Sequence, residues 1–90
     1  METIIIMTEV YSPYGKYIEF MNKDTRERLG EVDTCGRLYK IFYGAGRFEL
    51  IATRTNRDSA IRHLQKTISA GIQGTAKFRW NVMTTRIKYA

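Results

Sequence analysis

Residues 37–68 read RLYKIFYGAGRFELIATRTNRDSAIRHLQKTI, and within this stretch the apolar pattern changes from a strand period to a helix period. Residues 37–43 and 47–53 both carry aromatic and aliphatic side chains at alternate positions, which is typical of strands. Gly44-Ala45-Gly46 separates the two segments. Together they predict a β-hairpin with a short glycine turn.

The chain after this hairpin predicts one amphipathic helix. Thr55 is expected to cap the amide of Asp58, whose carboxylate complements the positive end of the helix dipole. The helix is expected to end near Ala70, before two glycines. Its buried face should consist of the apolar residues that recur at helical spacing, which are Ala60, Ile61, Leu64 and Ile68, with Ile72 as a further candidate.

Three further strands are predicted before the hairpin, over residues 3–11, 16–22 and 27–34. The third is the most charged, and we interpret it as a short edge strand whose charges discourage pairing with other chains. Residues 76–82 favour a final strand because they alternate around Phe78, Trp80 and Val82. Residues 76–90 also fit a helix with Trp80, Met83 and Ile87 at steps of three and four.

These elements predict an α+β fold. We expect an antiparallel β-meander of four to five strands, one amphipathic helix packed on one face, and a C-terminal strand. Residues 1–90 are predicted to form a single small basic domain, since ninety residues bury one modest core. The sheet face opposite the helix is expected to be open to water.

Composition places the chain among ordinary globular proteins, with 43% hydrophobic and 27% charged residues. The longest uninterrupted apolar run covers residues 4–7, far fewer than the roughly 20 residues that cross a bilayer. The single cysteine, Cys35, cannot form an intramolecular disulfide and fits a reducing compartment. We therefore expect a cytoplasmic protein with no membrane partner.

Charge is distributed unevenly along the chain, whose net charge is +6. Residues 46–90 contain nine basic and two acidic side chains, whereas residues 1–45 contain six basic and seven acidic. A local basic excess attracts phosphate backbones or acidic protein surfaces. Eight cations are predicted to contact phosphate: Lys40, Arg47, Arg54, Arg57, Arg62, Lys66, Lys77 and Arg79.

The helix start is the favoured contact among these, because Arg54 and Arg57 lie beside free amides that attract an anion. The alternative is an ordinary solvated helix face. Four aromatic residues are candidates for stacking on bases, with a role in the core as the alternative: Tyr17, Tyr39, Tyr43 and Trp80. Tyr39 and Tyr43 are favoured among them, because they share one strand face opposite Leu38 and Phe42.

Catalytic chemistry has little support in the sequence. His63 is the only histidine and has no cysteine or carboxylate at a spacing that suggests a metal site or a triad. Gly44-Ala45-Gly46 lacks the lysine and hydroxyl residue of a phosphate-binding loop. No enzyme activity, cofactor or metal is expected.

Residues 37–68 resemble in outline the sheet-then-helix DNA-binding domains of integrase arms and plant AP2-type factors. That resemblance implies a sheet that enters the major groove and a helix that braces it from behind. The residue types also resemble those of small toxin-type ribonucleases that act without metal, although those toxins place helices before the sheet.

The leading hypothesis is a non-enzymatic protein that binds DNA or RNA, or an accessory protein that contacts the phosphate backbone. The alternative is a small inhibitor or adaptor whose basic face docks on an acidic protein. A metal-independent ribonuclease is the third hypothesis. A homodimer through the first or last strand is also compatible with the pattern, if either is an unpaired edge.

Overall fold

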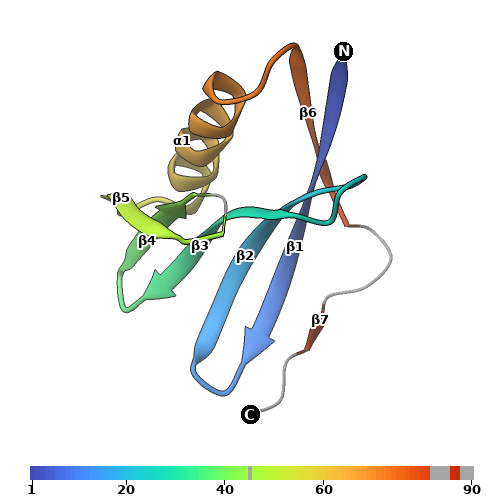
Figure 1. Ribbon diagram of the computed structural model, residues 1–90. Helices are drawn as coiled ribbons and strands as arrows, with labels where there is room; N and C mark the ends of the chain where they lie inside the picture. Colours follow the sequence, from blue (N-terminus) through green and yellow to red (C-terminus); the bar gives the residue numbers. More distant parts are fainter. Residues whose placement is uncertain (45, 82–85, 88–90) are drawn as a thin grey trace.

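The computed structural model describes residues 1–44, 46–81 and 86–87 of the chain (Figure 1). One sheet and one helix make up the fold of these residues. The elements in chain order are β1 (Glu2–Ser12), β2 (Gly15–Asn22), β3 (Arg28–Cys35), β4 (Leu38–Tyr43), β5 (Glu49–Arg54), α1 (Arg57–Ala70), β6 (Thr75–Trp80) and β7 (Arg86–Ile87).

The strands lie in the order β5-β4-β3-β2-β1-β6, and β7 pairs with the far end of β1. Strands β1 to β5 form an antiparallel meander. The helix leads from the β5 edge across one face of the sheet, and the chain returns as β6, parallel to β1 (Figure 1). The predicted α+β fold is therefore confirmed, with a mixed sheet instead of a purely antiparallel one.

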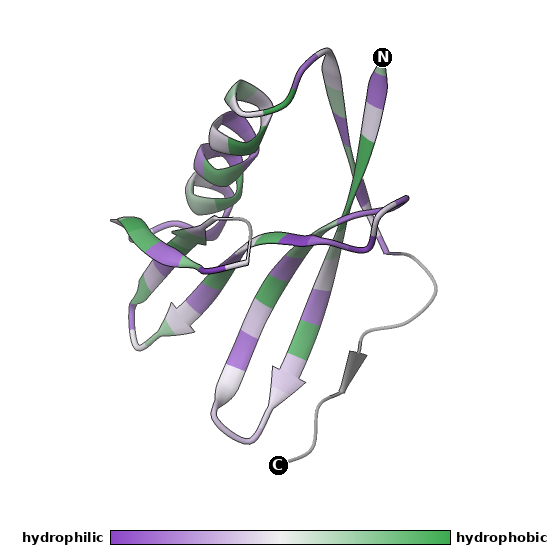
Figure 2. Ribbon diagram, in the orientation of Figure 1, coloured by the Kyte–Doolittle hydropathy of each residue, from purple (hydrophilic) through white to green (hydrophobic). Residues whose placement is uncertain are grey.

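The core lies between the helix and the sheet face that it covers. The predicted helix residues Ala60, Ile61, Leu64 and Ile68 are all buried. They pack against one face of β1 to β4, on which the buried residues are Ile5, Met7, Ile18, Phe20, Val32 and Ile41. Figure 2 shows this apolar stripe on the helix. The burial of these side chains gives the small domain its main stabilisation.

One glycine allows the helix to approach the sheet. A Cβ atom on Gly30 in β3 would lie 2.5 Å from the Phe42 carbonyl oxygen and 3.1 Å from Cδ1 of Leu64. Neither neighbour leaves room for a methyl group, because the first is backbone and the second is fully buried. The helix α1 can therefore pack closely on the centre of the sheet because Gly30 has no side chain.

The expectation that the third strand is an edge is wrong, and of the two strands considered as a dimer edge, only the last lies at an edge of the described sheet. Strand β3 lies between β2 and β4, and β1 lies between β2 and β6, so neither is an edge. We expected β3 at an edge because it is charged. An interior position is possible because Glu31 and Asp33 lie on the face that the helix does not cover. Within the described residues, β5 and β6 are the edges.

The helix cap also differs from the prediction. Asn56, with extended backbone, is the N-cap, and its side chain accepts a hydrogen bond of 3.0 Å from the Ser59 amide. The helix begins at Arg57. Thr55 and Asp58 have the right spacing, but the backbone turns into helix one residue later than we expected, and the cap moves with it.

The ends of the other described elements lie within two residues of the predicted ones. The helix ends at Ala70, and residues 75–80 form a strand. Residues 45, 82–85 and 88–90 lie outside the described residues, so parts of the predicted hairpin turn and of the tail are not covered. Among the described residues, no helix is long and apolar enough to cross a membrane.

Candidate functional site

The structure distributes the eight predicted phosphate contacts over different surfaces. Lys40, Lys77 and Arg79 lie on the sheet face opposite the helix, and the Lys77 ammonium is 3.2 Å from a Glu2 carboxylate oxygen. Strands β4 and β6 are four positions apart in the sheet, roughly 19 Å at ordinary strand spacing. The helix side holds Arg54, Arg57, Arg62 and Lys66, while Arg47 is exposed in the β4–β5 loop.

Among these helix-side cations, Arg57 contacts the sheet through Glu9 and Trp80. As the first helical residue it points toward the sheet, where its guanidinium forms an ion pair with Glu9 of β1. The same guanidinium lies 5.4 Å from the centroid of the Trp80 ring, a cation–π contact. The parallel pairing of β6 with β1 brings Trp80 to this position.

Exposed aromatic rings flank this ion pair. Trp80 is 41% exposed and Tyr11 is 42% exposed. The Tyr11 hydroxyl donates a hydrogen bond of 3.2 Å to Glu9. This bond and the charge of Glu9 raise the pKa of Tyr11 above its ordinary value. The surface therefore places the exposed rings of Trp80 and Tyr11 near the Arg57 guanidinium, whose charge the Glu9 carboxylate neutralises.

Arg54 is held next to the helix start. Its Nη1 donates to the Thr53 carbonyl at 2.7 Å, and its Nη2 lies 3.3 Å from Nδ1 of His63. Because a guanidinium can only donate, His63 must accept through Nδ1. The lone histidine therefore orients an arginine, which gives it a structural role next to the site.

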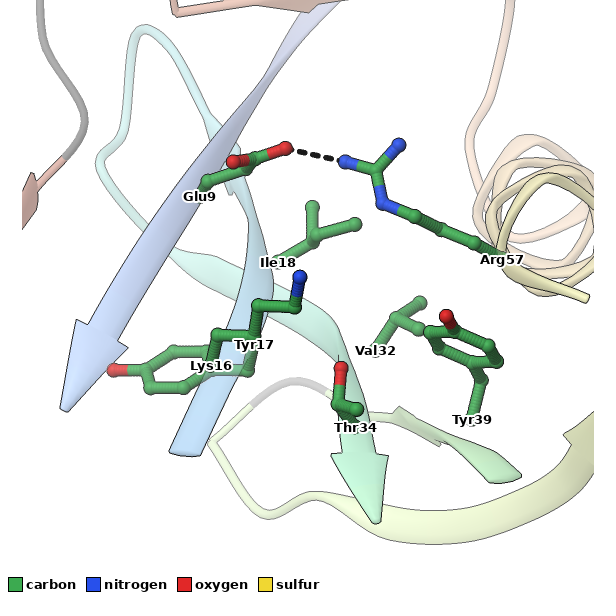
Figure 3. A pocket seen from close by; sticks show the side chains of 8 residues that line it. All are labelled: Glu9, Lys16, Tyr17, Ile18, Val32, Thr34, Tyr39 and Arg57. Carbon is green, nitrogen blue, oxygen red and sulfur yellow. Dashed lines mark hydrogen bonds and ion pairs between the residues drawn. The ribbon is translucent and has the colours of Figure 1, made fainter. Parts of the chain in front are cut away.

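A small hollow opens between the helix start and the sheet (Figure 3). The space inside it is about 20 Å³, room for about one water molecule. Ile18 and Val32 form an apolar floor, and Lys16, Thr34 and Tyr39 supply polar atoms. The full lining is Glu9, Lys16, Tyr17, Ile18, Val32, Thr34, Tyr39 and Arg57.

Tyr39 and Tyr43 lie on the helix-covered face of β4, on either side of the buried Ile41. Both are partly buried and pack against the core, which favours the core role over free stacking platforms. Tyr39 borders the hollow as well. Their neighbour Leu38 points to the other face and is 41% exposed.

The sheet face opposite the helix carries a group of carboxylates. Glu19 is 2% exposed and pairs across the strands with Glu31, and Asp33 lies two residues further along β3. Arg28 contacts Glu19 at 3.6 Å and Glu31 at 3.2 Å. Burial, with the added effect of Asp33, still raises the pKa of Glu31 to about 8 despite the arginine. Buried acids make this face poorly suited to entering a phosphate-lined groove.

No sequence pattern pointed to Lys16, Tyr11 or Glu9 as site residues, whereas Trp80 is one of the aromatic residues that the sequence offers for base stacking. Lys16 and Tyr11 are directly opposite each other in the β1–β2 hairpin, a register that the Ser12-Pro13-Tyr14-Gly15 turn could have revealed. The position of Trp80 depends on the parallel pairing, which has no local signal. No group of histidine, cysteine and carboxylate side chains within the described residues could hold a metal ion.

Comparison with known proteins identifies no relative: no protein-family model, no curated protein and no solved structure matches this chain. The chemistry of the surface around the helix start is therefore the basis for inferring a function.

Proposed function

We propose that this protein binds single-stranded nucleic acid, DNA or RNA, at the surface around the helix start. One observation carries the proposal: Arg57 lies beside the exposed rings of Trp80 and Tyr11, with Lys16 opposite Tyr11 in the hairpin. Proteins that bind unpaired strands combine cations that track the backbone with aromatic rings on which bases stack. Duplex DNA or RNA hides the faces of its bases from such rings.

The phosphate contacts are assigned to Lys16, Arg54 and Arg57, with Arg62 and Lys66 extending the basic surface along the exposed side of the helix. Arg62 and Lys66 are four residues apart, so they lie on the same face of the helix. Three contacts to a single strand predict that log K falls with log[salt] with a slope of about −2. Lys40, Lys77 and Arg79 lie on the other face and are not part of this surface.

The test is fluorescence anisotropy with labelled single-stranded and duplex DNA and RNA over a salt series. The double variant Arg54→Gln with Arg57→Gln should weaken binding of single strands and make the salt slope shallower. Lys23→Gln with Arg26→Gln, which removes two exposed cations between β2 and β3 at the other end of the sheet, is the matched control and should bind as the native chain does. Absence of binding to all four probes at low salt would overturn the proposal.

A protein partner is the second candidate, and the β5 edge favours it. Leu50 is 52% exposed and Ile51 is 39% exposed on an edge strand, at the bulge where the β4–β5 register shifts. An extended segment of an acidic partner can add to such an edge through main-chain hydrogen bonds. A second copy of this chain can add in the same way. Ile51→Lys should abolish either association and leave nucleic-acid binding intact.

A further inference from the structure

We infer that the bound strand continues from the helix start along the β1–β2 hairpin, and that Tyr14 at the hairpin tip stacks on the last base in contact. The ligand is therefore a single strand long enough to reach from Arg57 to this tip. The inference rests on the proposed nucleic-acid binding and deepens it, because it names a further contact residue and the length of strand that the surface takes.

Exposed aromatic rings gather along this hairpin. Among the described residues, the three aromatic side chains most open to water are Trp80 at 41%, Tyr11 at 42% and Tyr14 at 90%. Trp80 pairs with Met7 of β1, Tyr11 lies further along the same strand, and Tyr14 follows in the turn. Exposed apolar residues are ordinary when they are scattered singly, whereas a group of them marks a binding surface.

The end of the hairpin projects from the sheet. Strand β6 pairs with β1 only as far as Met7, and β3 pairs with β2 only as far as Tyr17. The last two pairs of the hairpin, residues 11–12 with 15–16, lie beyond both, and β7 adds only a short pairing at residues 10–11. Figure 1 shows this end extending away from the helix. Residues 12–15 therefore have no second neighbouring strand in the described part of the chain.

The turn holds the Tyr14 backbone in one conformation. Pro13 has a φ that its own ring restricts. The Ser12 hydroxyl donates to the Gly15 carbonyl at 2.9 Å and accepts from the Tyr14 amide at 3.3 Å. A base that stacks on Tyr14 therefore meets a platform that is already ordered, so little conformational freedom is lost on binding.

Cations accompany the rings along the same path. Arg57 lies 5.4 Å from the centroid of the Trp80 ring, and Lys16 pairs with Tyr11 across the hairpin. Lys16 is exposed and forms no ion pair within the described ranges, whereas Arg57 must be shared with Glu9. Rings that stack on bases and cations that hold phosphates are the two parts of a surface for unpaired strands. The hairpin supplies both.

The spacing of the rings predicts the length of the bound strand. Residues 7–12 of β1 span roughly 17 Å at the ordinary strand rise. A nucleic-acid strand at the duplex rise covers this distance with about five nucleotides, and a more extended strand needs fewer. Shorter strands can contact Trp80 or Tyr14 but cannot contact both.

The experiment measures anisotropy of labelled homopolymer strands between about two and ten nucleotides long. For the native chain we expect affinity to rise with length and to level off at about five nucleotides. Tyr14→Ala should weaken the binding of long strands about tenfold and that of the shortest strands less than about twofold. Unchanged affinity for long strands would overturn the inference while the proposed function stands. No binding of the native chain to any strand at low salt would instead overturn the proposed function.

Two further variants assign the effect to the ring at the tip. Tyr14→Phe keeps the aromatic face and should bind as the native chain does. Leu38→Ala removes a side chain that is 41% exposed beside the β3–β4 turn, and it is the matched control. An equal loss in Leu38→Ala, or a loss in Tyr14→Phe as large as that in Tyr14→Ala, would rule out stacking on Tyr14.

Trp80 reports separately on the other end of the path. It is the only tryptophan of the chain, so a change in intrinsic fluorescence on adding strand shows that a base has reached this ring. Tyr14→Ala should keep this fluorescence change at saturating strand, because only the hairpin end of the contact is lost. Loss of the change in a variant with native unfolding temperature would show that the two rings do not bind separate parts of one strand, which contradicts the inference.

Discussion

Arg57, the first residue of the helix, forms an ion pair with Glu9 of the first strand, 48 residues earlier in the chain. The pair joins the helix start to the part of β1 that extends beyond β6. It also sets the electrostatic state of the proposed site, because the central cation is neutralised until a ligand competes for it. Glu9 therefore opposes the binding of nucleic acid at the position where we propose that it binds.

Replacing Glu9 should strengthen binding. Glu9→Gln keeps the hydrogen-bonding shape, removes the negative charge and frees Arg57 for phosphate, so we expect affinity for single strands to rise about threefold to tenfold. Anisotropy at fixed salt measures this change. Asp24→Asn, in the β2–β3 turn, makes the same change in net charge far from the site and should have a much smaller effect. An equal gain in both variants would assign the effect to net charge alone.

The helix cap can be tested by paired substitutions. Asn56→Ala removes the side chain that accepts from the Ser59 amide, and we expect it to lower the free energy of unfolding by about 1 kcal/mol. Thr55→Ala should cost clearly less, since Thr55 makes no cap here. Urea denaturation of both variants measures the difference. A larger loss for Thr55→Ala would contradict the observed cap.

Gly30 should tolerate no side chain. Gly30→Ala places a methyl group against the Phe42 carbonyl and Leu64, and we expect a loss of about 1–3 kcal/mol. The control is Gly71→Ala at the helix end, where the new atom would meet the Tyr43 hydroxyl, the far end of a side chain that can move. Thermal unfolding should show the larger loss for Gly30→Ala. Equal losses would mean that β3 shifts to make room.

Stability should depend on pH through Glu31. Its pKa in the folded protein is about 8 against an ordinary value of 4.5, because of burial and then Asp33, with Glu19 adding and Arg28 opposing. Between these values the folded state holds a proton that the unfolded state has lost. The stabilisation present below about pH 4.5 is therefore lost as pH rises toward 8.

Glu31→Gln should remove this dependence. The variant is expected to be more stable than the native chain at pH 8 and to show a flatter profile of unfolding temperature against pH. The exposed Glu27 gives the control variant Glu27→Gln, which should keep the native profile. A Glu31→Gln protein that is less stable than the native chain at pH 8 would show that the Arg28 ion pair outweighs the burial of the acid.

Local sequence patterns were sufficient to predict the individual strands and the helix. Alternating residues in 37–43 and 47–53 predicted β4 and β5, and the spacing of Ile61, Leu64 and Ile68 predicted the buried face of α1. Strand and helix periods are properties of neighbouring residues, so they can be read without knowing which strands pair. The basic character of the helix start was also visible, because Arg54 and Arg57 are close in sequence.

The sequence by itself therefore determined the α+β class, the helix with its buried face and the concentration of positive charge. Only the tertiary structure decided that β1 and β3 are interior, that Trp80 lies beside Arg57, and that Glu9 neutralises this arginine. The contacts of Arg57 with Trp80 and Glu9, and the pairing of β1 with β6, join residues more than twenty positions apart. They depend on the strand order and on the helix crossing that makes β6 parallel to β1, which are set by packing over the whole sheet and leave no periodic signal in the chain.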